Sequence, residues 1–397
     1  MRRLGRFVVV LLLVVAAAGQ LLAWTSPSWW VPVLQWWPVQ YAVIVPGIVR
    51  DALGVWVVAV AALLLALAVL TGPRDGGSPW RRPATVVAAL TLVSSVVLHG
   101  VQVTQARGEG AEVAVVAPAV PFRDPTPTPD REVVVGTVGD DEDLLADLYL
   151  PDDPPAGGAP VVVRVHGGGF DSGSKAPSPY FTPLLAEGFA VLDVTYRLAS
   201  PQRQTWDTAV ADVGCALTWI AVDGVAAGLD PTRVGTLGES AGGQLAVNAA
   251  NLATLGELEP SCRSAEDLPD VGAVVAGYPA VDGAAAYEDS ALGQAYGDRY
   301  VGGPPEEFPE RYELTDSVNH VSADGAPLLI YQGSADHLIL PGPVRDFARA
   351  STEAGTLTRY VELRGQEHTT GGGLGTLSFG DLVGRDLTTR WFVEHLR

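Results

Sequence analysis

The sequence predicts an α/β domain, in which a mainly parallel sheet is covered by helices on both faces, preceded by a membrane-spanning segment. Three observations carry this prediction. The first 110 residues contain long apolar stretches, a proline-rich segment follows, and eight apolar, β-branched runs occupy the remainder, with helix-like segments between many of them. Continuous apolar strands that alternate with helices are typical of a parallel sheet buried on both faces.

The charge distribution divides the chain in the same way. Residues 1–110 carry eight arginines against Asp51, Asp75 and Glu109, a net charge of +5, whereas the remainder carries 17 basic against 42 acidic residues, a net charge of −25. The acidic part would repel nucleic-acid phosphates, so we expect no nucleic acid as a partner. An acidic composition mainly favours solubility, and it does not identify a substrate.

Three stretches, residues 4–22, 53–71 and 84–103, are predicted to span a bilayer. Each is long enough to cross ~30 Å of hydrocarbon at ~1.5 Å per residue. A secretory signal peptide is the alternative for the first stretch, because it follows Met1-Arg2-Arg3; the later spans argue against cleavage. Residues 39–49 are apolar but short, and are interpreted as an interfacial or re-entrant piece, or as part of a fourth span.

The orientation follows from two arginine clusters, which prefer the cytoplasm. Three spans place both clusters on that side and everything after residue 105 outside; the clusters are Arg2, Arg3 and Arg6, and Arg74, Arg81 and Arg82. Only His99 is ionisable well inside a span, so residues 1–110 are predicted to be a membrane anchor without chemistry of its own, with the lipid bilayer as its partner. Residues 111–130 form a proline-rich linker, which holds itself extended.

Residues 131–397 are sufficient for one large domain. The predicted strands are 132–138, 144–150, 160–165, 189–195, 233–237, 271–277, 328–332 and 357–363, and the clearest helices are 205–222, 242–253, 343–354 and 380–396. In such a sheet, functional sites form at the carboxyl ends of the strands. The candidate catalytic residues all follow strands in this way.

A nucleophile motif, Gly238-Glu239-Ser240-Ala241-Gly242, lies between the strand 233–237 and a helix. A serine on a sharp strand-to-helix turn stands clear of the sheet, where a base and a substrate carbonyl both reach its hydroxyl. The flanking glycines are required because the turn leaves no room for Cβ atoms and strains the backbone at the serine.

A second motif, His166-Gly167-Gly168-Gly169, directly follows the strand 160–165. Its glycine N–H groups can converge on a developing oxyanion. The alternative, a phosphate-binding loop, lacks the Lys-Ser/Thr pair and the helix that should follow at once. His166 is interpreted as organising this loop through a backbone hydrogen bond.

Candidates for the acid and the base come late in the chain. Asp336 lies just past the strand 328–332, where a carboxylate can orient an imidazole; a turn-forming aspartate is the alternative, and Asp282 is the competing acid. His368 follows the last strand by a short loop and is preferred as the base. His337 abuts the acid and would have to turn back on it. The chain order Ser240, Asp336, His368 is the one expected for a strand–serine–helix nucleophile.

With these motifs, the domain resembles the α/β-hydrolase esterases of the hormone-sensitive-lipase-like and carboxylesterase type. Besides the two motifs and the late His368, the resemblance rests on Tyr196-Arg197-Leu198-Ala199, Leu229-Asp230-Pro231 and Gly333-Ser334-Ala335-Asp336. It covers residues 131–397 and implies an eight-stranded sheet with Gly168, Gly169 and Ala241 as oxyanion donors. Glu239 departs from the aspartate of many members, and any cap must come from residues 282–322.

The resemblance also bears on Cys215 and Cys262. In this fold the helices before and after the nucleophile lie on one face of the sheet, so we expect a disulfide between them, which would persist outside the cell. Neither cysteine has metal-ligand companions, so no metal is expected.

The predicted function is hydrolysis of a carboxylic ester, with a short-chain or acetyl ester, possibly linked to the cell envelope, as substrate and with no cofactor. Two other functions stay open at this point: a peptidase or amidase on the same fold, and a non-catalytic binding module attached to the membrane.

Overall fold

The structure is a computed structural model, which describes residues 2–54, 56–70, 81–113, 126–139, 141–178, 180–262, 268–368 and 378–397. Most of the predicted linker lies outside these residues, as does Arg74. The chain divides into two compact units. The helical unit comprises the described parts of 1–123, 333–338 and 362–383, and the sheet unit comprises those of 124–332, 339–361 and 384–397.

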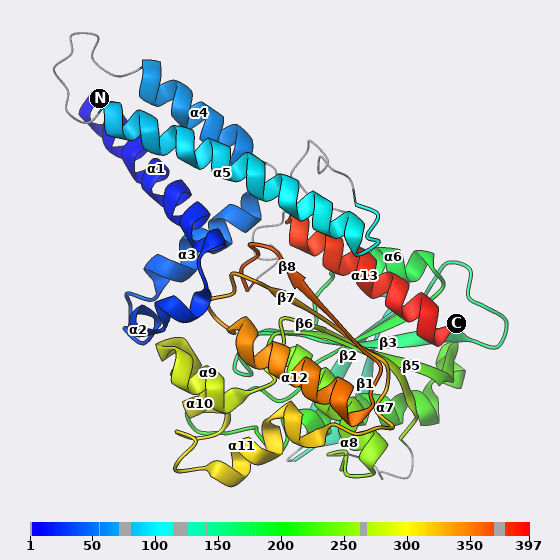
Figure 1. Ribbon diagram of the computed structural model, residues 1–397. Helices are drawn as coiled ribbons and strands as arrows, with labels where there is room; N and C mark the ends of the chain where they lie inside the picture. Colours follow the sequence, from blue (N-terminus) through cyan, green and yellow to red (C-terminus); the bar gives the residue numbers. More distant parts are fainter. Residues whose placement is uncertain are drawn as a thin grey trace. The chain divides into compact units, whose positions relative to one another are not determined.

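The sheet unit is built on an eight-stranded, mostly parallel sheet (Figure 1). This confirms the sheet that the sequence predicts. The order is β1-β2-β4-β3-β5-β6-β7-β8. β1 pairs with β2 and β2 with β4 in antiparallel fashion, and the pairs from β4 through β3, β5 and β6 to β7 are parallel. The strands are Arg131–Val138, Glu142–Tyr149, Ala159–Val165, Ala190–Val194, Leu229–Glu239, Val271–Gly277, Leu328–Gly333 and Thr358–Leu363.

Helices cover both faces of this sheet, as the apolar strands require. Figure 1 shows α6 (Phe181–Ala186) and α13 (Phe379–Leu396) over one face, and α7 (Ala209–Asp223), α8 (Ala241–Leu255) and α12 (Pro341–Ala354) over the other. Packing against α13 is close: a Cβ added at Gly235 of β5 would lie 2.6 Å from Cε1 of Phe392. The four predicted helices of this domain are confirmed.

The predicted cap region, residues 282–322, forms three short helices and a 3₁₀ turn. These are α9 (Gly283–Asp289), α10 (Ala291–Tyr300), α11 (Pro309–Thr315) and η4 (Ser317–His320). Asp282 caps α9 by accepting a hydrogen bond from the Ala285 N–H at 2.8 Å, and Ser290 caps α10. This capping role explains the Asp282 carboxylate without a catalytic function.

The helical unit contains α1 (Arg2–Trp24), η1 (Pro27–Trp30), α2 (Val31–Leu34), α3 (Tyr41–Leu53), α4 (Trp56–Leu70) and α5 (Arg81–Gly108). α1 packs against α3, α4 and α5, and α4 packs against α5. A cluster of Leu13, Leu64 and Ala88 fills the space between α1, α4 and α5.

Two of these helices, Phe7–Trp24 and Arg82–Gly108, are long and apolar enough to cross a membrane. The predicted span 53–71 becomes the 15-residue α4, which is ~22 Å long at ~1.5 Å per residue. α3 precedes it at an angle of 106°, and counting the bent pair as one broken span gives up to three. α3 takes up most of the apolar stretch 39–49.

The expected disulfide is present: Cys215 on α7 is bonded to Cys262 in the segment after α8, with the two Cα atoms 5.8 Å apart. It lies against Gly136 of β1, where an added Cβ would come within 2.5 Å of the Cys262 sulfur. The disulfide therefore joins α7 to the segment after α8 and packs against the edge strand β1.

Removing this bond by the double substitution Cys215→Ala and Cys262→Ala should lower the free energy of unfolding by about 4 kcal/mol, because the bond closes a 47-residue loop in the unfolded chain. Thermal melts of both proteins measure the change, and peptide mapping with and without reductant detects the bond. Two free thiols in the unreduced wild-type protein would contradict the structure.

Candidate active site

Ser240 lies on the turn between β5 and α8 with φ 56° and ψ −123°, a left-handed backbone conformation that is rare for a residue other than glycine. The turn is tight because neighbouring backbones touch. Added Cβ atoms at Gly238 and Gly242 would overlap the backbone of Gly242 and the carbonyl oxygen of Val165, respectively. The predicted need for glycine at both positions is thereby explained.

The turn is also hydrogen-bonded to the neighbouring strand. The Ser240 N–H donates to the Gly277 carbonyl oxygen at the end of β6 (2.9 Å), and the Ser240 carbonyl oxygen accepts from the Ala280 N–H (3.2 Å). The surrounding sheet therefore holds the strained residue in place, which is the arrangement expected where backbone strain serves a function.

The glycine loop after β3 lies directly beside this turn. An added Cβ at Gly167 would be 2.8 Å from the Glu239 carbonyl oxygen and 3.3 Å from Cβ of Ser240. Gly168 and Gly169 follow with φ values of 126° and 61°, which glycine adopts without strain. Ala241 is the first residue of α8, and the first N–H groups of a helix have no intrahelical partner.

His166 organises this loop, as the sequence predicts. Its Nδ1 lies 2.8 Å from the Gly167 carbonyl oxygen, its ring stacks on Tyr196 at 4.4 Å between centroids, and the Tyr196 hydroxyl donates to the His166 carbonyl oxygen. Burial lowers the pKa of His166 to about 4, so the imidazole is neutral near pH 7.

The cap helix α10 contacts the same loop, a feature that the sequence does not reveal. The Phe170 ring stacks on Tyr300 at 3.8 Å between centroids, and Arg299 forms an ion pair with Asp171. An added Cβ at Gly169 would collide with the Tyr296 ring. Aromatic side chains of α10 thus take up the space next to the glycine loop.

Glu239, the residue before the candidate nucleophile, is part of a buried ionic cluster. Arg164 of β3 lies 3.4 Å from Glu239 and 3.2 Å from Asp193 of β4. Burial alone would lower the pKa of Arg164, but the two carboxylates raise it above its usual value. Burial also raises the pKa of Asp193 to about 6, although Arg164 opposes this rise.

The candidate acid and base form a buried pair within the helical unit. Nδ1 of His368 lies 2.8 Å from Oδ2 of Asp336, and the exposed fractions of the two side chains are 3% and 0%. The Leu338 N–H donates to Oδ1 of Asp336 at 2.9 Å, which fixes the carboxylate. Asp336 therefore meets the geometric requirement for orienting the His368 ring. The contact between Ser240 and His368 stays a prediction.

A second acid–histidine pair lies beside the first. Nδ1 of His337 is 2.9 Å from Oε2 of Glu367, whose Oε1 accepts from the His337 N–H at 2.7 Å. The dipeptides Asp336-His337 and Glu367-His368 thus pair reciprocally, each acid with the histidine of the other. Burial raises the pKa of Glu367 above its usual value, although His337 opposes the rise. His337 is engaged by Glu367, which supports the choice of His368 as the base.

Comparisons with known proteins agree with this picture. A sequence model of the BD-FAE family matches residues 146–349. The chain is 27% identical over 239 residues to Esterase LipQ of Mycobacterium tuberculosis, an alignment that spans 58% of this chain and 55% of the relative. It is 30% identical over 250 residues to an ethyl acetate hydrolase of Pseudomonas putida, covering 58% of this chain and 73% of that protein. The chain thus spans only about half the length of some curated relatives.

Among solved structures, a truncated form of a carbohydrate esterase from gut microbiota superimposes with a TM-score of 0.57 at 21% identity. The match covers 68% of this chain and 99% of that one. This likeness concerns the fold, which is the mainly parallel α/β sheet that the sequence predicts.

The buried cluster gives a stability prediction. Arg164→Met should lower the free energy of unfolding by about 3–5 kcal/mol, because it leaves two buried carboxylates without their cation. Denaturant unfolding of the full chain in detergent measures the loss. Arg233→Met is the matched control: Arg233 pairs with Asp230 in a more exposed position, so its loss should cost at most about 1 kcal/mol. Equal losses in the two variants would contradict the assignment.

Proposed function

The chain belongs to the BD-FAE family, and on that premise we propose that it is a serine esterase that hydrolyses carboxylic esters. The observation that carries the proposal is the strained Ser240 on a glycine-flanked turn, with the glycine loop after β3 packed against it. Relatives described as an esterase and an ethyl acetate hydrolase support the reaction class.

In the proposed reaction, Ser240 Oγ attacks the ester carbonyl carbon while His368 Nε2 takes the hydroxyl proton. The carbonyl π electrons move to the oxygen, which the N–H groups of Gly168, Gly169 and Ala241 stabilise. Collapse of this intermediate breaks the bond to the alcohol, and His368 returns the proton to the leaving oxygen. Water then attacks the acyl-enzyme in the same way and releases the acid and free serine.

Asp336 has two tasks in this scheme. It accepts the hydrogen bond of His368 Nδ1, which leaves Nε2 as the basic nitrogen, and it stabilises the imidazolium that forms during each proton transfer. Its complete burial strengthens both effects, because no water competes for the carboxylate.

We assign a short acyl group to the substrate. The aromatic side chains of α10 support this, since Tyr296 abuts Gly169 and Tyr300 stacks on Phe170. A short or acetyl ester needs little space beyond the oxyanion loop, whereas a long chain would have to displace these rings. The ethyl acetate hydrolase among the relatives is consistent with this size.

We further propose three membrane spans with the hydrolase domain on the extracytoplasmic side, where envelope-linked esters are accessible. Two features support the placement. Exposed apolar side chains on α1 and α5, such as Phe7, Leu11, Leu90 and Val93, suit a lipid environment. The Cys215–Cys262 disulfide suits an oxidising compartment.

The first test uses the full chain in detergent micelles with p-nitrophenyl acetate and butyrate. Ser240→Ala should lower kcat/KM by at least about 10³-fold and abolish labelling by a fluorophosphonate probe, because only an activated serine reacts. Ser322→Ala, outside the described site, is the matched control and should keep both. A folded wild-type chain that neither labels nor hydrolyses would refute the esterase proposal, and hydrolysis of anilides at similar rates would indicate an amidase.

A second prediction concerns the oxyanion loop. Gly167→Ala should lower kcat by about 10²–10³-fold, the cost of losing an oxyanion donor, because the new methyl group pushes the loop away from Ser240. Gly342→Ala, where an added Cβ meets no atom within 4 Å, is the control and should leave kcat unchanged. Unaltered turnover in Gly167→Ala would remove the loop from the mechanism.

A further inference from the structure

The segment that carries His368 is bound by residues of the N-terminal helices. The side chain of Gln105 on α5 donates to the Glu362 carbonyl oxygen (2.5 Å) and accepts from the Arg364 N–H (2.9 Å). Gln102 on the same helix donates to the Arg364 carbonyl oxygen at 2.9 Å. Two glutamines one turn of helix apart thus satisfy the backbone where β8 ends.

The turn that follows packs directly on the helices. Gly365 has a φ of 64°, and an added Cβ there would lie 2.7 Å from the Leu98 side chain of α5 and 3.3 Å from Ala23 of α1. No space for a side chain therefore exists between this backbone and the two helices.

A buried charged residue, Asp51 on α3, makes a further contact with this segment. Its Oδ2 accepts a hydrogen bond from the Glu367 N–H at 2.5 Å, directly before His368. Its Oδ1 accepts from Nε of Arg50 at 2.7 Å, and Nη1 of Arg50 donates to the Gly19 carbonyl oxygen of α1 at 2.8 Å. Both charged residues are buried, with 3% and 4% of their surface exposed.

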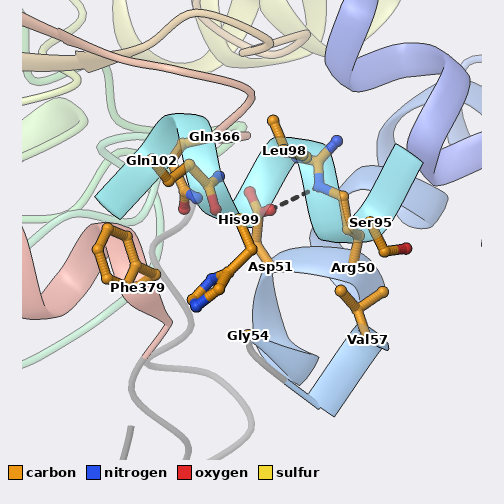
Figure 2. Close-up of a pocket in the computed structure, with 10 residues that line it drawn as sticks. All are labelled: Arg50, Asp51, Gly54, Val57, Ser95, Leu98, His99, Gln102, Gln366 and Phe379. Carbon is orange, nitrogen blue, oxygen red and sulfur yellow. Dashed lines mark hydrogen bonds and ion pairs between the residues drawn. The ribbon is translucent and has the colours of Figure 1, made fainter. Parts of the chain in front are cut away.

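Figure 2 shows Asp51 and Arg50 in the cavity that α3, α4 and α5 form with Gln366 and Phe379. The dashed line marks the ion pair between Arg50 and Asp51. In this view the side chains of Gln102 and Gln366 lie on the side of the Asp51 carboxylate opposite to Arg50. A charged pair among apolar helices is costly unless its hydrogen bonds are made. Here the Asp51 carboxylate makes one of them to the backbone of the candidate catalytic loop.

We propose that Asp51 is a positioning residue for the catalytic base, and that the N-terminal helices are required for full turnover. The inference rests on the proposed esterase function. A hydrogen bond from a backbone N–H to a buried carboxylate is charge-assisted and strong. It fixes the Gln366–Glu367 peptide, one residue before His368, whose side chain pairs with Asp336. A displacement of about 1 Å in a catalytic group costs about 10²-fold in rate. The N-terminal helices would then contribute to catalysis as well as to membrane attachment.

The test compares Asp51→Ala with Ser95→Ala in the full chain in detergent micelles. Ser95 of α5 is buried and lines the same cavity as Asp51, but its hydroxyl donates within its own helix, to the Thr91 carbonyl oxygen. We expect Asp51→Ala to lower kcat about 10- to 100-fold with KM within about twofold, and to slow fluorophosphonate labelling in proportion. Ser95→Ala should change neither quantity by more than about twofold.

Asp51→Asn extends the test to the case in which the alanine variant does not fold. The amide keeps the side-chain volume but replaces one carboxylate oxygen by an NH₂ donor. Because Glu367 and Arg50 donate to different oxygens of Asp51, only one of the two donors keeps its acceptor in this geometry. The kcat of Asp51→Asn should lie between those of the wild type and Asp51→Ala. If Asp51→Ala does not fold, the kcat of Asp51→Asn should still be severalfold below that of the wild type. A single symmetrical peak in size-exclusion chromatography and an intact Cys215–Cys262 bond identify folded protein.

The outcomes separate the two proposals. If the wild type hydrolyses esters and a folded Asp51 variant matches it in kcat and labelling rate, the positioning role is wrong and the esterase assignment stands. An equal loss in Ser95→Ala also overturns the role of Asp51, since general disturbance of the helices would then explain both. If the wild type itself neither labels nor turns over, the esterase proposal fails, and this inference with it.

Discussion

The arrangement around Ser240 depends on the close approach of three backbone segments. The end of β5, the start of α8 and the loop after β3 meet where Gly167, Gly238 and Gly242 leave no room for a side chain. Each glycine serves a different contact, so a Cβ at any one of them separates a different pair of segments. The positive φ of Ser240 is stable because hydrogen bonds from β6 and the segment after it hold the turn from the other side.

A second constraint acts on the late part of the chain, where two acid–histidine dipeptides pair reciprocally. His337 contacts Glu367, and His368 contacts Asp336. The segment after β7 and the segment after β8 therefore cannot shift relative to each other without breaking both pairs. All four side chains are buried, which makes a broken contact expensive. The pairing therefore holds the His368 ring against Asp336, and it gives His337, next to the candidate acid, a partner of its own in Glu367.

Local patterns in the sequence were sufficient for the eight strands, the main helices and the glycine-flanked serine, because each depends on residues close together in the chain. Contacts between distant residues were beyond reach where neither a motif nor the family resemblance indicated them, as these did for Cys215–Cys262 and for Asp336–His368. Asp51 and Glu367 are 316 residues apart, and nothing in either neighbourhood indicates the other. The Arg164–Glu239 pair and the contact of Tyr296 with Gly169 were missed for the same reason. One signal was available: an acid followed by histidine occurs after each of the last two strands, although only the fold reveals that the two dipeptides pair.

The proposed catalytic residues are divided between the two compact units of the chain. The nucleophile turn and the glycine loop rest on the core of the sheet unit, whereas the acid and the base belong to the same compact unit as the apolar helices. Gln102 and Gln105 donate hydrogen bonds to the backbone before His368, and Asp51 accepts one from it. These bonds satisfy backbone groups that would otherwise need water as a partner. Deleting the helices would expose these backbone groups and the Glu367 N–H together. The apolar helices are thus part of the structural framework of the candidate base, because both belong to the same compact unit.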